Sequence, residues 1–151
     1  MFPTRTRFLL LTVLLCLPLL VACGAAALAP SPTPAPLGAV VTTAHGQYRD
    51  ITADDLHTML EHKDFFLVDV HVPHEGRLPD LDARIPYDQI ANQLDKLPAD
   101  KAAKIVLTCK GGGMSTKAAT TLADQGYTNV YNLAGGYVGW RDKGYPLTRE
   151  P

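Results

Sequence analysis

The sequence has no excess of charge of either sign. Its 151 residues include 14 Lys and Arg and 15 Asp and Glu, which gives a formal net charge of −1. Proteins that bind nucleic acid through its phosphate backbone carry clustered positive charge, and long runs of one charge are typical of interaction tails. This sequence has neither, so we expect no nucleic-acid partner, and the function must be sought in local motifs.

The sequence also lacks the standard motifs for nucleotide and zinc binding. The glycines at 111–113 are not followed by the Gly-Lys-Ser/Thr order of a phosphate-binding P-loop, because Lys117 comes after Ser-Thr. His45, His57 and His62 are not spaced as zinc ligands, and we expect them on the surface. The sequence therefore predicts neither a metal site nor a cofactor.

A long apolar run occurs at the N-terminus. Two arginines precede the run FLLLTVLLCLPLLVAC, which Pro18 interrupts and which is short for a transmembrane helix. A basic segment followed by an apolar one is typical of an export signal. The run ends in Leu-Val-Ala-Cys at 20–23, which resembles the lipobox of bacterial lipoproteins. The resemblance implies cleavage before Cys23 and a lipid on its thiol; a plain secretory signal cut near residues 25–29 is the alternative.

The segment after Cys23 is rich in Pro and Ala and carries no charge. Such a segment cannot bury enough apolar surface to order itself, so it is interpreted as a semi-extended tether. We therefore expect a signal peptide at 1–22, a tether at 23–45 and one globular domain at 46–151. Several acyl chains on one residue give stable attachment, which predicts a lipid-anchored protein on the extracytoplasmic face of a membrane, periplasmic or at the cell surface.

The sequence contains only three cysteines. Cys16 would be removed with the signal and Cys23 would carry the lipid, which leaves Cys109 without a partner. Exported domains usually pair their cysteines, so an unpaired Cys109 suggests a chemical role. The alternative is a small, buried apolar side chain at the end of a strand.

The globular part alternates strand and helix patterns, which predicts an α/β fold with a mainly parallel central sheet flanked by helices. Thr52 followed by Asp55 resembles a capping box. We predict strands at 48–51, 65–70, 83–85, 104–108 and 129–132, and helices from 52, over 87–97, over 115–125 and from 135.

Cys109 lies at the carboxyl end of a predicted buried strand, where such sheets bind ligands. The backbone N–H groups from Lys110 to Ser115 can form an anion-binding nest, and Ser115, as N-cap, would add the positive end of a helix. The glycines leave space in the pocket. The segment therefore predicts a nucleophilic sulfur surrounded by hydrogen-bond donors, with Lys110 either adding a positive charge at the rim or simply solvated.

The sequence Cys-Lys-Gly-Gly-Gly-Met-Ser at 109–115 resembles the active-site loop of rhodanese domains, Cys-x-x-Gly-x-Arg-Ser, with Gly112 and Ser115 at the family's Gly and Ser. Further segments resemble the family in the same order along roughly a hundred residues. They are the strand ending in Asp-Val at 65–70, Ala-Arg-Ile-Pro at 83–86, the segment 126–136 followed by Trp140, and Gly-Tyr-Pro-Leu at 144–147.

The resemblance implies a monomeric sulfurtransferase in which Cys109 takes the outer sulfur of a small donor such as thiosulfate and holds it as a persulfide. A thiol or cyanide then accepts the sulfur. This is covalent catalysis with a ping-pong course. The resemblance places substrate binding on the remaining loop residues, Lys110, Gly111, Gly112, Gly113, Met114 and Ser115.

Two positions depart from the family pattern. Met114 stands where many family loops have Arg, which argues against a phosphate-ester hydrolase and favours a rival interpretation, a non-catalytic domain that binds a ligand or protein. His71 replaces the usual Arg after Asp-Val, and His71 and His74 are either pocket residues or solvated loop histidines. Asp69 either orients the loop or bonds backbone N–H groups.

Overall fold

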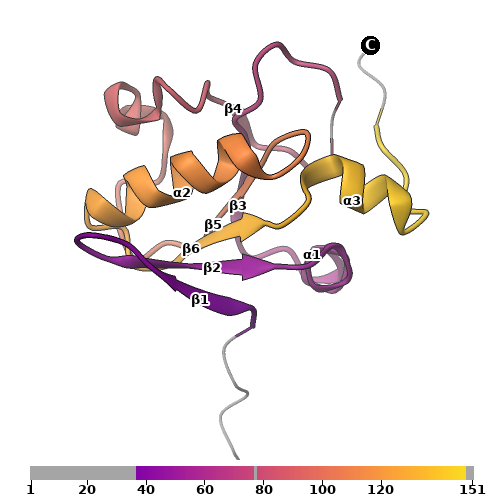
Figure 1. The fold of residues 1–151 in the computed structure, drawn as a ribbon, viewed down its shortest axis with the longest axis horizontal. Helices are drawn as coiled ribbons and strands as arrows, with labels where there is room; N and C mark the ends of the chain where they lie inside the picture. Colours follow the sequence, from indigo (N-terminus) through magenta and orange to yellow (C-terminus); the bar gives the residue numbers. More distant parts are fainter. Residues whose placement is uncertain (1–36, 77, 149–151) are drawn as a thin grey trace, which may run out of the picture. The chain divides into compact units, whose positions relative to one another are not determined.

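Six strands form one sheet in the order β1-β2-β6-β5-β3-β4 in a computed structural model that describes residues 37–76 and 78–148. β1 is antiparallel to β2, and all other neighbouring strands are parallel. This mixed, mainly parallel sheet confirms the predicted α/β fold (Figure 1). The strands are β1 Ala39–Thr42, β2 Gln47–Ile51, β3 Phe66–Asp69, β4 Ala83–Arg84, β5 Ile105–Thr108 and β6 Val130–Leu133.

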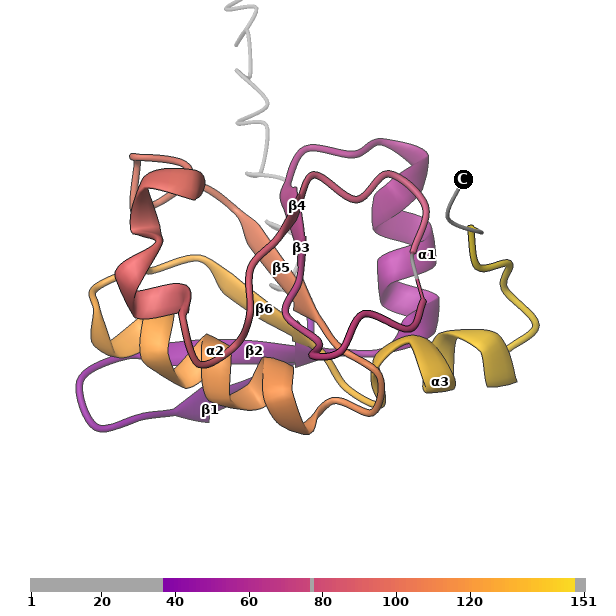
Figure 2. The same ribbon diagram turned by 90° about the horizontal axis from the view of Figure 1, so that it is seen from above.

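Helices cover the two faces of the sheet. On one face, α2 packs on β2, β5 and β6, and the 3₁₀ helix η1 lies against it. On the other face, α1 and α3 contact each other (Figures 1 and 2). The helices are α1 Ala53–Glu61, α2 Gly113–Asp124, α3 Gly136–Asp142 and the 3₁₀ helices η1 Ile90–Asn92 and η2 Leu94–Lys96.

The middle of the sheet is the core of the domain. Every residue of β5 and β6 is buried, as expected of parallel strands with helices on both faces. Ile105, Leu107 and Cys109 join the apolar cluster under α2, whereas Val106 joins the cluster under α1 and α3. The alternation along β5 therefore connects Cys109 to the α2 side of the core.

The predicted capping box at the start of α1 is confirmed. The Thr52 hydroxyl accepts a hydrogen bond of 3.1 Å from the Asp55 N–H, and the Asp55 carboxylate accepts one of 2.9 Å from the Thr52 N–H. Such a cap stabilises a helix by about 1 kcal/mol. It fixes the point where β2 ends and α1 begins.

The structure corrects the sequence analysis at three places. Residues 39–42, assigned to the tether, form β1, because they pair with β2 through backbone hydrogen bonds that side-chain composition does not reveal. The α-helix predicted over 87–97 is wrong, since that segment forms the two short 3₁₀ helices. The helix predicted from Ser115 begins two residues earlier, because Gly112 adopts a φ of +93° and acts as its N-cap.

Residues 1–36 lie outside the described part of the chain, and with them the predicted signal, Cys16, Cys23 and most of the predicted tether. None of the helices described between residues 37 and 148 is long and apolar enough to cross a membrane.

Candidate active site

Cys109 follows the last residue of β5 and lies at the carboxyl edge of the parallel strands, as predicted. Its side chain is 1% exposed. The backbone then turns through residues 110–112 and enters α2 at Gly113. The strand and the helix thus fix both ends of the short loop around the sulfur.

Hydrogen-bond donors surround the sulfur of Cys109. The N–H of Gly112 lies 3.1 Å from Sγ, the N–H of Ser115 3.4 Å and the Ser115 hydroxyl 3.3 Å. The same hydroxyl lies 2.9 Å from the carbonyl oxygen of Gly112. Its single proton is therefore given either to that carbonyl or to the sulfur, and a negative sulfur would draw it. Such donors, together with the N-terminal end of α2, stabilise negative charge on Sγ.

Of the three glycines at 111–113, only Gly112 has a backbone conformation that a residue with a side chain would rarely adopt. A Cβ on Gly112 would lie 3.0 Å from the Gly135 nitrogen, in a conformation that L side chains rarely adopt. Cβ atoms on Gly111 and Gly113 would meet nothing within 4 Å. These two glycines leave open space around the loop.

The first turn of α3 holds the Cys109 loop in place. The N–H of Tyr137 donates a hydrogen bond of 3.0 Å to the Cys109 carbonyl, and the N–H of Val138 donates one of 3.0 Å to the Lys110 carbonyl. Gly136 makes this approach possible, since a Cβ there would lie 2.0 Å from the Cys109 oxygen. The segment that resembled the family's closing signature thus acts as a support for the loop.

Of the predicted loop residues, Lys110 and Met114 are engaged elsewhere. Lys110 forms an ion pair with Glu75, and about half of each side chain is exposed. This pair holds the pKa of the Glu75 carboxyl below its usual range. Met114 is half-buried and packs against the apolar core beneath α2. The charge of Lys110 is therefore already paired with Glu75, and Met114 adds no charge to the site.

Asp69, His71 and Tyr137 lie beside the loop and are buried. The Asp69 carboxylate accepts a hydrogen bond of 3.0 Å from the His71 backbone N–H, and burial raises the pKa of this carboxyl. The rings of His71 and Tyr137 meet edge to face, with centroids 5.9 Å apart. His71 is thus a buried residue at the strand ends and not a solvated loop histidine.

Tyr137 was missed by the sequence analysis. Burial, with smaller contributions from Glu75, Asp69 and Cys109, raises the pKa of its hydroxyl to about 12. The available signal was its place directly after Gly135-Gly136, because glycines that allow a close backbone approach also bring the next side chain to the loop. His74 lies nearby, with Nδ1 3.7 Å from the Asp69 carboxylate.

The remaining predicted residues lie away from this site. His45, His57 and His62 are exposed, as expected, and His57 stacks on Tyr145. Within the described ranges, no three His, Cys, Asp or Glu side chains gather as metal ligands would. Cys23 lies outside those ranges.

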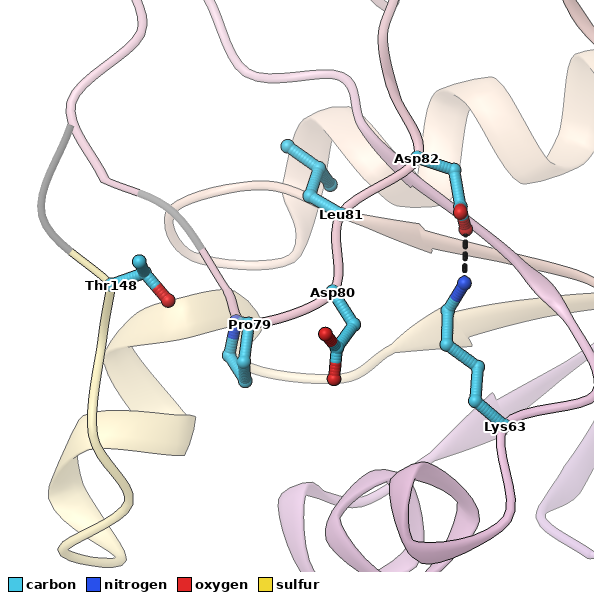
Figure 3. Close-up of a pocket in the computed structure, with 6 residues that line it drawn as sticks. All are labelled: Lys63, Pro79, Asp80, Leu81, Asp82 and Thr148. Carbon is cyan, nitrogen blue, oxygen red and sulfur yellow. Dashed lines mark hydrogen bonds and ion pairs between the residues drawn. The ribbon is translucent and has the colours of Figure 1, made fainter. Parts of the chain in front are cut away.

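A separate open hollow of about 720 Å³ lies between the loop at 79–82 and the C-terminal segment (Figure 3). It contains the Lys63–Asp82 ion pair but none of the side chains around Cys109.

Comparison with known proteins agrees with this geometry. Residues 52–143 match the sequence profile of the Rhodanese-like domain. A sulfurtransferase of Allochromatium vinosum is 34% identical over 88 residues, covering 56% of this chain and 79% of the relative. Thiosulfate sulfurtransferase 18 of Arabidopsis thaliana is 34% identical over 83 residues, 54% of this chain and 57% of the relative. A tRNA uridine(34) hydroxylase of Erwinia tasmaniensis is 32% identical over 107 residues, but these cover only 31% of that protein.

Solved structures give the same family. A rhodanese-related protein from Thermoplasma volcanium superimposes with a TM-score of 0.59 at 28% identity, over 68% of this chain and all of that one. A rhodanese-like domain protein from Staphylococcus aureus superimposes with a TM-score of 0.57 at 31% identity, over 68% of this chain and 98% of that one. The profile match, the sheet and the loop around Cys109 together establish that this chain belongs to the rhodanese-like domain family.

Proposed function

We propose that this protein is a sulfurtransferase that moves a sulfane sulfur from a small donor to a thiophilic acceptor through a persulfide on Cys109. The observation that carries the proposal is the contact of Sγ with the N–H groups of Gly112 and Ser115 at 3.1 and 3.4 Å. Support comes from the family and from the relatives named as sulfurtransferases in Allochromatium vinosum and Arabidopsis thaliana.

The first half-reaction loads the sulfur. The Cys109 thiolate attacks the outer sulfur of a donor such as thiosulfate, and sulfite leaves with the electron pair of the broken S–S bond. The donors around Sγ stabilise negative charge before and after this step, which is the usual role of preorganised N–H groups in catalysis. We expect the donor to approach over Gly111 and Gly113, where a side chain would meet nothing within 4 Å.

An alternative function is a non-catalytic binding domain, and one observation favours it. Many family loops use the Arg position for an anionic ligand, but here Met114 packs against the core and Lys110 is paired with Glu75. An anionic donor would therefore depend on the backbone N–H groups. Hydroxylation of tRNA has no such support, since the matched segment is less than a third of that relative.

The deciding experiment is the intact mass of the full chain, incubated first with thiosulfate and then with cyanide. We expect a gain of one sulfur atom with thiosulfate and its removal by cyanide. Cys109→Ser is the control, with circular dichroism to verify its fold, and should gain nothing. If the wild-type chain stays unmodified while it binds thiosulfate or another ligand, the binding-domain alternative is correct.

We also propose that the protein is lipid-anchored through Cys23 on the extracytoplasmic face of a membrane, on the basis of the lipobox-like ending Leu-Val-Ala-Cys. Cys23→Ala should move the protein from the membrane fraction to the soluble fraction. Continued membrane association of this variant would contradict the anchor.

A further inference from the structure

Three buried side chains beside the Cys109 loop carry polar atoms that form no hydrogen bond to any described residue. The atoms are Oδ2 of Asp69, both ring nitrogens of His71 and the hydroxyl of Tyr137. These residues are 2%, 7% and 5% exposed. Buried polar atoms in folded proteins are nearly always hydrogen-bonded, and leaving one unpaired costs about 1–3 kcal/mol. Ordered water or a polar ligand would pair such atoms, and their place beside the Cys109 loop favours a ligand.

The group lies beside the nucleophilic loop. The N–H of Val70 donates a hydrogen bond of 2.8 Å to the carbonyl of Thr108, so His71 follows the position that lies alongside Cys109. Neighbouring strands are about 4.8 Å apart, so the backbone of His71 lies close to the loop. The ring of His71 turns towards Tyr137, at the start of α3. Tyr137 connects the two, since its ring contacts the ring of His71 and its backbone N–H donates a hydrogen bond to the carbonyl oxygen of Cys109.

The charges around His71 suit a neutral ligand. The cation at the rim, Lys110, is paired with Glu75, and Arg84 on β4 interacts electrostatically with Asp69. Each cation thus faces a carboxylate, so a ligand with two negative charges gains little electrostatic attraction here. A neutral ligand with an acidic proton can instead hydrogen-bond to the imidazole of His71 and the phenol of Tyr137. The groups that interact with His71 are Asp69 on β3, Glu75 in the loop that follows and Tyr137 on α3. Around these three lie His74 and Arg84, which interact with Asp69, Lys110, which pairs with Glu75, and Cys109, which interacts with Tyr137.

We propose that His71 is the general base that deprotonates the sulfur acceptor, a small neutral thiol, and that the Tyr137 hydroxyl hydrogen-bonds the same thiol. This inference rests on the proposed persulfide at Cys109. Histidine is the side chain most often used for such proton transfer. Because Cys109 and His71 are both buried, the acceptor is a low-molecular-weight thiol and not a cysteine on a folded protein surface.

The step is a redox-neutral exchange. The persulfide anion left by loading takes one proton from solvent. His71 then takes the thiol proton, and the resulting thiolate attacks the outer sulfur of the Cys109 persulfide. A new S–S bond forms to the acceptor, and the bond between the outer sulfur and Sγ breaks with its electron pair on Sγ. The acceptor leaves as a persulfide, Cys109 returns to its thiolate, and the proton on His71 passes to solvent.

The test follows discharge of the sulfur-loaded full chain by three acceptors at mildly alkaline pH. Mercaptoethanol needs a base, whereas trifluoroethanethiol and sulfite are already largely ionised. His71→Ala should slow discharge by mercaptoethanol about 100-fold and leave discharge by the other two within a few-fold. Added imidazole should restore part of the rate, and the pH profile for mercaptoethanol should move to higher pH. Tyr137→Phe should slow mercaptoethanol discharge several-fold.

His62→Ala is the matched control, because His62 is an exposed histidine at the end of α1, and it should behave as the wild type. His71→Gln, which keeps a polar side chain, guards against a loss that reflects misfolding alone. If His71→Ala and His71→Gln slow all three acceptors equally, His71 is structural and the inference is overturned. If the wild-type chain never takes up sulfur, the proposed function itself is wrong, and the inference falls with it.

Discussion

The backbone N–H of Tyr137 donates a hydrogen bond of 3.0 Å to the carbonyl oxygen of Cys109, so α3 supports the Cys109 loop from a segment that begins 27 residues further along the chain. The contact depends on Gly136, whose φ of +56° and missing Cβ let the two backbones meet. The position of the Cys109 loop thus depends on the packing of the short helix α3.

Gly136→Ala should therefore destabilise the protein and displace the loop. A Cβ would lie 2.0 Å from the Cys109 oxygen and would need a left-handed backbone, so we expect a loss of about 2 kcal/mol or more, measured by urea unfolding. Gly139→Ala in the same helix is the control. A Cβ there meets its nearest atom at 3.7 Å, and the better helix propensity of Ala should leave stability unchanged or raise it by up to about 1 kcal/mol. Equal effects of the two substitutions would contradict the close approach.

Ser115→Ala should slow sulfur loading without unfolding the protein. It removes the hydroxyl that lies 3.3 Å from Sγ, and the loss of one such donor to a developing anion typically costs about 100-fold in rate. The measurement is the single-turnover rate of mass gain with thiosulfate. Thr121→Ala removes a hydroxyl bonded to the Lys117 carbonyl on the same helix and should leave the rate unchanged. A rate for Ser115→Ala equal to that of the Thr121 variant would show that the hydroxyl serves the helix and not the sulfur.

Met114→Arg should improve binding of an anionic donor, because Arg offers charge-assisted hydrogen bonds that Met cannot. We expect the KM for thiosulfate to fall about tenfold, equivalent to about 1.4 kcal/mol. Met114→Gln is similar in length but uncharged and should leave the KM near that of the wild type. If both variants lower the KM alike, release of Met114 from the core and not the new charge is responsible.

Asp69→Asn should make the protein more stable at neutral pH. Burial raises the pKa of Asp69 in the folded state, so its contribution to stability is fully present below the ordinary pKa of an Asp and is lost as the pH rises through the raised value. An amide removes that loss and can still accept the hydrogen bond from the His71 N–H. The Tm of the variant should therefore exceed that of the wild type at neutral pH, and the difference should shrink as the pH falls.

Asp124 should show the opposite dependence of the Tm on pH, because its pKa is lowered and not raised. Hydrogen bonds from the Thr43 hydroxyl and the His45 N–H hold its pKa below the usual range. Asp124→Asn should consequently lower the Tm at neutral pH and lose its effect in acid. If the two variants shift the Tm in the same direction, the assignment of these two carboxylates is wrong.

The sequence predicted the features that depend on local pattern. The runs that became β3 and β5, the capping box at Thr52 and the glycine-rich loop after Cys109 are all readable from neighbouring residues, because strand burial, helix caps and turns leave regular signals within a few positions. The same local patterns give a wrong prediction for residues 90–97. Their apolar spacing matches an α-helix, yet the backbone there bonds at the shorter 3₁₀ interval. The first of the two turns, η1, packs against α2.

What the sequence by itself determined is the fold class, the place of Cys109 at a strand end and the donors that follow it within six residues. Tertiary structure alone decided which distant groups complete the site. Tyr137 reaches Cys109 through Gly136, Glu75 pairs with Lys110 across the rim, and His71 is buried against Tyr137. These contacts join residues 28 to 66 positions apart in the chain. No local pattern encodes them, because they arise only when parallel strands bring their carboxyl ends to one edge of the sheet.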